Sequence, residues 1–118
     1  MSVTIYGIKA CDTMKKARDW LDGQGVSYAF HDYKVSGVDR ASLERWVAVL
    51  GWETVLNRAG TTFRKLAEAD KQDLNPGKAM DLMQAQPSMI KRPILDIDGK
   101  LTAGFRPDIY AQAFRTAG

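Results

Sequence analysis

Apolar and polar side chains alternate along residues 3–6, in a segment rich in β-branched residues that stops at Gly7. This pattern is typical of a β-strand. After Cys11 the apolar residues recur at helical spacing as far as Gly23, which predicts a helix. Alternation returns along residues 26–32. The first part of the chain is therefore expected to form a right-handed βαβ unit with parallel strands.

From residue 37 to residue 88 the pattern is mostly helical. Apolar residues spaced i, i+3, i+4 and i+7 from Leu43 predict a helix that begins at Asp39, a favourable N-cap residue, and ends at Gly51. Shorter apolar groups predict short helical segments around a loop at residues 57–62. The sequence NPG at residues 75–77 predicts a break before one more helix, which ends at Pro87.

The last third of the chain returns to strands. Two apolar runs, residues 93–97 and 100–105, flank an Asp-Gly pair, which is a strong signal for a β-hairpin. Pro107 is expected to open a final helix. The sequence contains no internal repeat, low-complexity segment or linker. We therefore expect a single α/β domain, residues 1–118, with a helical insertion at about residues 37–88.

Composition narrows the class of protein. The chain has 118 residues, of which 45% are hydrophobic, enough for one domain with a buried core. No apolar run is long enough to span a membrane, and no signal peptide is evident, so no membrane partner is expected. A single cysteine suits a reducing compartment, which favours the cytoplasm. The net charge of +3 comes from scattered basic residues, so it is only a weak indication that the protein binds nucleic acid. A local anion-binding pocket explains the positive charge as well.

The single cysteine, Cys11, lies between the first predicted strand and the first predicted helix, with Lys9, Lys15 and Lys16 close in sequence. Unpaired N–H groups and the helix dipole favour an anion at a helix N-terminus, and a thiolate is such an anion. Cys11 is therefore a candidate nucleophile. The alternative is that it is a small buried apolar residue, as free cysteines often are.

Four short sequences, YGIKACDT, AGTTFRKL, IKRPIL and GFRPDIY, occur in this order at residues 6–13, 59–66, 90–95 and 104–110. Together they resemble the arsenate reductase-like family of thioredoxin-fold proteins, which includes glutaredoxin-coupled enzymes and the Spx-type regulators of RNA polymerase. The likeness is greatest to its YffB-type branch of reductases. The resemblance implies a thioredoxin-like fold, in which a βαβ unit and a ββα unit form one mixed four-stranded sheet.

Many thioredoxin-like proteins carry a second cysteine two residues after the first, but Met14 stands near that place here and cannot resolve a disulfide. A monothiol mechanism follows, in which Cys11 attacks the substrate and glutathione or a glutaredoxin completes the exchange. Thr13 has two possible roles. It either caps the helix or forms a hydrogen bond to the sulfur or to a bound oxyanion.

The resemblance implies that Pro93 follows a cis peptide bond opposite the nucleophile, where the backbone can pair with a peptide-like substrate. Arginine forms bidentate bonds to oxyanions, and Arg92 and Arg106 match two of the three arginines around the nucleophile of arsenate reductases. At the third position the alignment places Asn57, with Arg58 next to it. The implied site consists of Cys11 as the catalytic residue and, for substrate or anion binding, Arg92, Arg106, Arg58, Thr13 and Pro93.

Other chemistries find less support in the sequence. His31 is the only histidine, so a histidine cluster for a metal is excluded, and a surface or structural role is expected for it. Phosphate-loop and dinucleotide-binding glycine patterns are absent, so neither a metal nor a nucleotide is expected as cofactor. The leading hypothesis is a cytoplasmic, glutathione-dependent thiol oxidoreductase that acts on a small oxyanion or thiol. The alternatives are an arsenate reductase coupled to glutathione and glutaredoxin, and an Spx-like protein that binds RNA polymerase without redox catalysis.

Overall fold

A computed structural model describes residues 1–117 and divides the chain into two compact units. The first unit combines Met1–Ser36 with the chain from Arg92 onward, and the second is Gly37–Lys91. The second unit begins where the helical insertion is expected and ends three residues later than predicted. Each unit is described by itself below.

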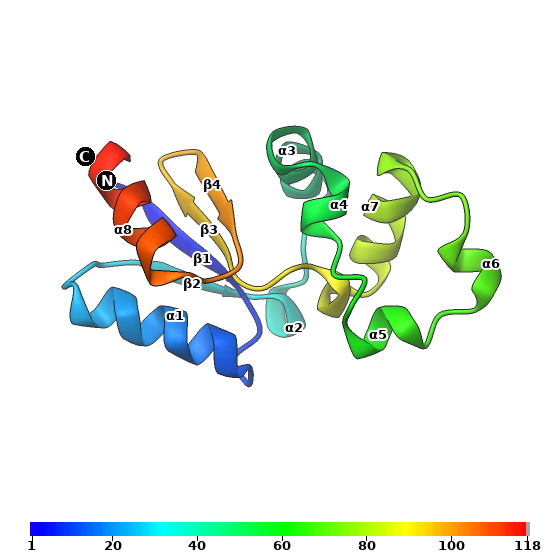
Figure 1. Cartoon of the computed structure of the whole chain (residues 1–118), viewed down its shortest axis with the longest axis horizontal. Coiled ribbons are helices and arrows are strands. Elements are labelled where there is room, and N and C mark those ends of the chain that lie inside the picture. The colour runs from blue at the N-terminus through cyan, green and yellow to red at the C-terminus, as the bar shows by residue number, and fades with distance from the viewer. Residues whose placement is uncertain (118) are drawn as a thin grey trace. The chain divides into compact units, whose positions relative to one another are not determined.

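The first unit contains a mixed four-stranded sheet in the order β2-β1-β3-β4, and Figure 1 shows these strands side by side. β1 pairs in parallel with β2, as predicted, and antiparallel with β3, which forms a hairpin with β4. The helices of this unit are α1, α2 and α8. The strands are β1 (Val3–Gly7), β2 (Ala29–Asp32), β3 (Ile94–Ile97) and β4 (Lys100–Ala103), and the helices are α1 (Asp12–Gly23), α2 (Tyr33–Ser36) and α8 (Pro107–Ala117).

Helices α1 and α8 share one hydrophobic core with the sheet. Alternate residues of β1 and β3 point into this core, as the period of two in a strand requires. Its buried members are Val3, Ile5, Met14, Ala17, Leu21, Leu95, Ile97, Tyr110 and Ala113. Because α1 and α8 both contribute to this cluster, the two helices cover the same face of the sheet.

The second unit is helical. Asp39 caps α3 as predicted, because its carboxylate accepts a hydrogen bond from the Ser42 N–H group at 2.8 Å. Helix α3 contacts α4 and α7, and the Arg40 guanidinium donates to the Asp81 carboxylate of α7 at 2.7 Å. The elements are α3 (Arg40–Leu50), α4 (Trp52–Val55), α5 (Thr61–Arg64), α6 (Glu68–Lys71), α7 (Pro76–Ala85) and a 3₁₀ turn at Pro87–Met89.

Several sequence-based boundaries differ from the structure, among them the end of β4, which is Ala103 rather than residue 105. Strand β2 begins at Ala29 rather than at residue 26, because the Val26 N–H group bonds the Leu21 carbonyl at 3.0 Å and thereby ends α1. Helix α7 begins at Pro76, within the segment of residues 75–77 that was predicted as a break before it. Asn75 is the N-cap of α7, and its side chain accepts from the Lys78 N–H group at 2.9 Å, while Pro76 occupies the first helical position.

Gly7, at the end of β1, lies directly against the side chain of Met14 in α1. A Cβ atom at position 7 would overlap the Met14 sulfur and lie 2.7 Å from its Cε atom. Met14 is fully buried in the core, so its side chain has little freedom to move away. This close approach fixes how the N-terminal turn of α1, with Cys11 before it, sits on the end of the sheet.

We expect Gly7→Ala to lower the free energy of unfolding by about 1–3 kcal/mol, because it overpacks the contact with Met14. Urea denaturation followed by circular dichroism measures this change. Gly23→Ala is the matched control, since no heavy atom lies within 4 Å of the added Cβ there. Equal stability of the two variants would contradict the proposed overpacking.

Candidate active site at one end of the sheet

The strand register brings the predicted site residues of the first unit to one end of the sheet. Gly7, the last residue of β1, is paired with Asp32, the last residue of β2, and the neighbouring Tyr6 is paired with Ile94, the first residue of β3. Ile94 is in turn paired with Ala103, the last residue of β4. The chain therefore leaves β1 toward Cys11, enters β3 from Arg92 and Pro93, and leaves β4 toward Arg106 at the same end.

Cys11 is the N-cap residue of α1, with extended backbone angles (φ −143°, ψ 128°). Its carbonyl accepts from the Lys15 N–H group at 2.9 Å, but its side chain makes no capping hydrogen bond. The side chain is half-buried and packs against the edge of the hydrophobic core. The thiol therefore lies at an uncapped helix N-terminus, where the first N–H groups and the helix dipole stabilise negative charge.

The three lysines near Cys11 in sequence do not share one environment. Lys9 and Lys16 are exposed. The Lys15 ammonium donates to the Asp19 carboxylate at 2.9 Å, and this hydrogen bond, with the charge of Asp19, raises the pKa of Lys15 above its ordinary value. The Lys15 ammonium therefore remains protonated and is paired with Asp19, one turn further along α1.

Thr13 is an exposed residue in the first turn of α1. Because Cys11 occupies the N-cap position, Thr13 does not cap the helix, and that alternative is wrong. A role for Thr13 in binding substrate stays a prediction.

The peptide bond between Arg92 and Pro93 is cis, as expected from the resemblance. Pro93 is buried, and its carbonyl accepts from the Gly104 N–H group at 2.8 Å, which ties the entry of β3 to the exit of β4. Arg92 is half-buried. The residue precedes β3 at the sheet end where the chain also leaves β1 for Cys11.

Arg106 lies between β4 and α8, and its carbonyl accepts from the Tyr110 N–H group at 3.0 Å in the first turn of α8. The guanidinium donates to the Asp108 carboxylate at 3.1 Å. Both side chains of this ion pair are well exposed, so solvent screens it and it contributes little to stability. An incoming anion can therefore compete with Asp108 for Arg106.

Arg58 belongs to the second unit, in the turn between α4 and α5. Its guanidinium carbon lies 5.5 Å from the centroid of the Trp52 ring, a cation–π contact. The neighbouring Asn57 donates its N–H group to the Met89 carbonyl at 2.7 Å. The predicted participation of Arg58 in an anion site stays a prediction.

An aromatic group next to Arg92 was missed in the sequence. Tyr33 begins α2 directly after β2 and is 2% exposed, and the ring of His31 lies 6.3 Å from it and 5.1 Å from Tyr6. Burial, together with Tyr6, raises the pKa of Tyr33 well above its ordinary value, although the charge of Arg92 acts in the opposite direction. His31 is thus a half-buried packing residue. The signal for Tyr33 was its place directly after a strand that ends at the site.

Neither a metal-binding cluster nor a membrane-spanning helix is found among the described residues. Among residues 1–117, no group of three or more histidine, cysteine, aspartate or glutamate side chains is placed to hold a metal ion. In the same part of the chain, no helix has the length and apolar character needed to cross a membrane.

The following features define the thioredoxin-like class. The sheet is mixed, in the order β2-β1-β3-β4, and a thiol stands between the first strand and the start of a helix. An Arg-Pro pair precedes the antiparallel strand β3. Residues 6–113 match the sequence profile of the ArsC family. The chain belongs to the ArsC family.

Individual relatives agree with this assignment. The chain is 40% identical over 112 residues to an uncharacterised protein of Haemophilus influenzae, a match that covers 95% of this chain and 98% of the relative. It is also 27% identical over 108 residues to the global transcriptional regulator Spx of Streptococcus mutans. This match covers 90% of this chain and 78% of the relative.

Two solved structures are similar over nearly the whole chain. The YFFB protein is 64% identical, with a TM-score of 0.93, covering 95% of this chain and 98% of its own. An arsenate reductase (ArsC) related protein from Brucella melitensis is 56% identical, with a TM-score of 0.77. This match covers 98% of this chain and 96% of that protein's chain.

Proposed function

We propose that the protein is a glutathione-dependent monothiol oxidoreductase in which Cys11 is the nucleophile. The observation that carries this proposal is the position of the only thiol in the chain, uncapped at the start of α1 and at the same sheet end as two arginines. Membership of the ArsC family supports it. A reducing compartment such as the cytoplasm supplies the glutathione that this chemistry needs.

The proposed cycle has two thiol–disulfide exchanges. The Cys11 thiolate attacks the glutathione sulfur of a mixed disulfide, the substrate sulfur leaves as a thiolate, and that thiolate takes a proton from water. The thiolate of a second glutathione then attacks the glutathione sulfur bound to Cys11. Glutathione disulfide leaves, and Cys11 returns as a thiolate. The net reaction consumes the mixed disulfide and one glutathione thiol, and it yields the substrate thiol and glutathione disulfide.

The proposed binding residues have separate roles. Arg92 and Arg106 hold the carboxylates or oxyanion of the substrate, because guanidinium groups bind such anions through two parallel hydrogen bonds. The backbone next to Pro93 pairs with the extended peptide of glutathione. Thr13 donates a hydrogen bond to the bound anion, and Arg58 is the third anion-binding arginine.

Incubation of the reduced protein with glutathione disulfide tests the first exchange. We expect mass spectrometry to find a single glutathione adduct on Cys11, and added glutathione to remove it. Turnover of a glutathionylated peptide with glutathione alone, followed as formation of glutathione disulfide, tests the full cycle. An unmodified Cys11 and no turnover above the uncatalysed rate would contradict the proposal.

Arsenate reduction is the second candidate, favoured by the Brucella melitensis relative, which is described as related to arsenate reductase. Here Cys11 attacks the arsenic atom, and glutathione with glutaredoxin supplies the electrons that release arsenite. Formation of arsenite that requires both glutathione and glutaredoxin would establish it. The likeness to Spx raises a third candidate, binding to RNA polymerase, for which the lack of a second cysteine is unfavourable.

A further inference from the structure

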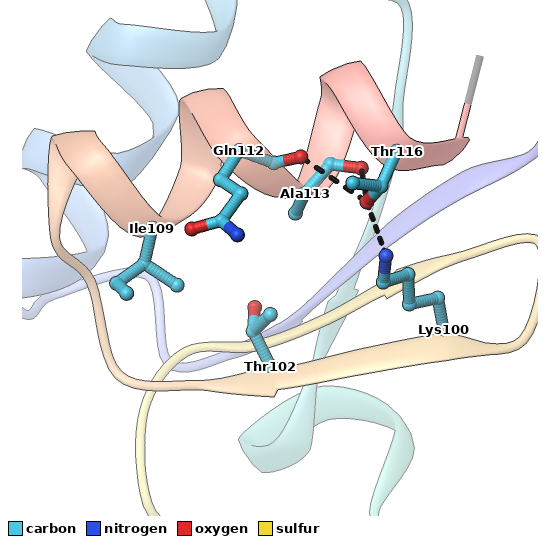
Figure 2. A pocket seen from close by; sticks show the side chains of 6 residues that line it. All are labelled: Lys100, Thr102, Ile109, Gln112, Ala113 and Thr116. Atoms are coloured by element: carbon cyan, nitrogen blue, oxygen red, sulfur yellow. Dashed lines mark hydrogen bonds between the residues drawn. The ribbon is translucent and has the colours of Figure 1, made fainter.

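A cavity of about 150 Å³ lies between β4 and α8 in the first unit, separate from the thiol site. β4 is the edge strand of the sheet, so the cavity lies at the side of the unit. Figure 2 shows its lining side chains directed toward one another across the space between strand and helix. They are Lys100, Thr102, Ile109, Gln112, Ala113 and Thr116.

One residue of the lining, Thr102, carries a polar atom without a hydrogen-bond partner. The Thr102 Oγ1 atom is buried and has no hydrogen-bond partner among the described residues. In Figure 2 this hydroxyl points from β4 toward α8. Folding removes the Thr102 hydroxyl from water without a compensating hydrogen bond. This is unfavourable unless a ligand group in the cavity supplies that bond. A ligand group that reaches this hydroxyl would supply the missing hydrogen bond.

The wall near the C-terminal end of α8 carries a positive charge. The Lys100 ammonium donates to the Thr116 hydroxyl, which itself lies 3.1 Å from the Gln112 carbonyl and 3.2 Å from the Ala113 carbonyl. Thr116 thus holds the ammonium at the side of the cavity. Lys100 is the one charged residue of the lining, and the side-chain amide of Gln112 faces the same space in Figure 2.

The remaining wall is apolar. The Ile109 and Ala113 side chains line it from α8, and Ile109 is 39% exposed although it is a large hydrophobic residue. A ligand that fits this lining has an anionic end for Lys100 and Thr102 and a short apolar part for the α8 side. A cavity of this size accommodates a ligand of about six non-hydrogen atoms.

We propose that the cavity between β4 and α8 binds a small aliphatic carboxylate. The carboxylate accepts hydrogen bonds from the Lys100 ammonium and the Thr102 hydroxyl, and the alkyl chain lies against Ile109 and Ala113. The site is independent of Cys11 and of the function proposed above, because none of its residues belongs to the thiol site.

Titration of the full chain with butyrate, followed by ¹H–¹⁵N NMR, tests this proposal. We expect chemical-shift changes confined to the lining residues, with a dissociation constant in the millimolar range for so small a probe. Lys100→Met is expected to weaken binding about tenfold or more, and Thr102→Val roughly three- to tenfold. Butyramide and butylamine, which have similar size but no negative charge, are expected to bind more weakly than butyrate.

Two controls separate recognition from general effects. Lys16→Met removes the same charge from an exposed position of α1 and is expected to leave butyrate binding unchanged. Without butyrate, Thr102→Val is expected to be as stable as the wild type or more stable, because it removes a buried hydroxyl that lacks a partner. The proposal is overturned if butyrate causes no localised shifts, if both site variants bind it as the wild type does, or if butyramide binds equally well.

Discussion

Replacing Cys11 with serine is expected to reduce the transfer of glutathione to the uncatalysed rate. A hydroxyl stays protonated at neutral pH and is a far weaker nucleophile than a thiolate, and the chain has no other cysteine that could take its place. The measurement is the formation of glutathione disulfide from a glutathionylated peptide and glutathione, with mass spectrometry to detect the adduct.

The fold of the Cys11→Ser variant must be shown to be intact. Serine has nearly the shape of cysteine, and the side chain is only half-buried at the edge of the core. We therefore expect the free energy of unfolding to change by about 1 kcal/mol or less. Wild-type protein alkylated at Cys11 is a second inactive control. A well-folded serine variant that retains turnover would exclude Cys11 as the nucleophile.

Replacing Arg92 with alanine is expected to lower kcat/KM for the glutathionylated peptide about 10- to 100-fold, the range expected on losing one charge-assisted hydrogen bond. The loss should be mainly in KM if Arg92 binds a carboxylate of glutathione, and mainly in kcat if it holds the thiolate. Arg92→Lys should be intermediate, because lysine keeps the charge but cannot form two parallel hydrogen bonds.

Arg115→Ala is the matched control for Arg92→Ala. It removes the same charge from an exposed position near the end of α8, whereas the site lies at the start of that helix. We expect it to leave kcat/KM close to that of the wild type. If the Arg92 and Arg115 variants are equally active, Arg92 has no role in binding the substrate.

The sequence predicted the sheet well because its strands are marked by local chemistry. The hairpin of β3 and β4 follows from Asp98 and Gly99, which both adopt positive φ angles (51° and 91°), as a tight two-residue turn requires. The helices α1 and α3 follow from apolar residues at helical spacing. Each of these signals lies within a few residues and needs no knowledge of the rest of the chain.

Features that depend on distant contacts were harder to predict. The one-turn helices α2 and α6 have no periodic pattern of their own, since a single turn is stable only when other parts of the protein hold it. Tyr33 was missed for the same reason, because its burial beside His31 exists only after β2 joins the sheet. The unsatisfied hydroxyl of Thr102 depends on how α8 lies over β4.

The site residues of the first unit were proposed from the resemblance to a known family, and for Cys11 also from its place between a predicted strand and a predicted helix. Cys11, Pro93 and Arg106 follow or precede segments with strong strand patterns, so the topology alone brings them to one end of the sheet. Arg58 lacks such a marker. It follows the short helix α4 in the second unit, and no strand register fixes its place.

The pairing of β1 with β3, from Val3 opposite Ile97 to Tyr6 opposite Ile94, joins segments separated by most of the chain. During synthesis on the ribosome, β1 and Cys11 emerge early, but β3 and Arg92 emerge only after the whole of Gly37–Lys91. Strand β1 therefore pairs with β3 only after Gly37–Lys91 has been synthesised, and closing so long a loop carries an entropic cost. A nascent chain stalled before Arg92 contains Cys11 but lacks β3 and β4, which complete the sheet.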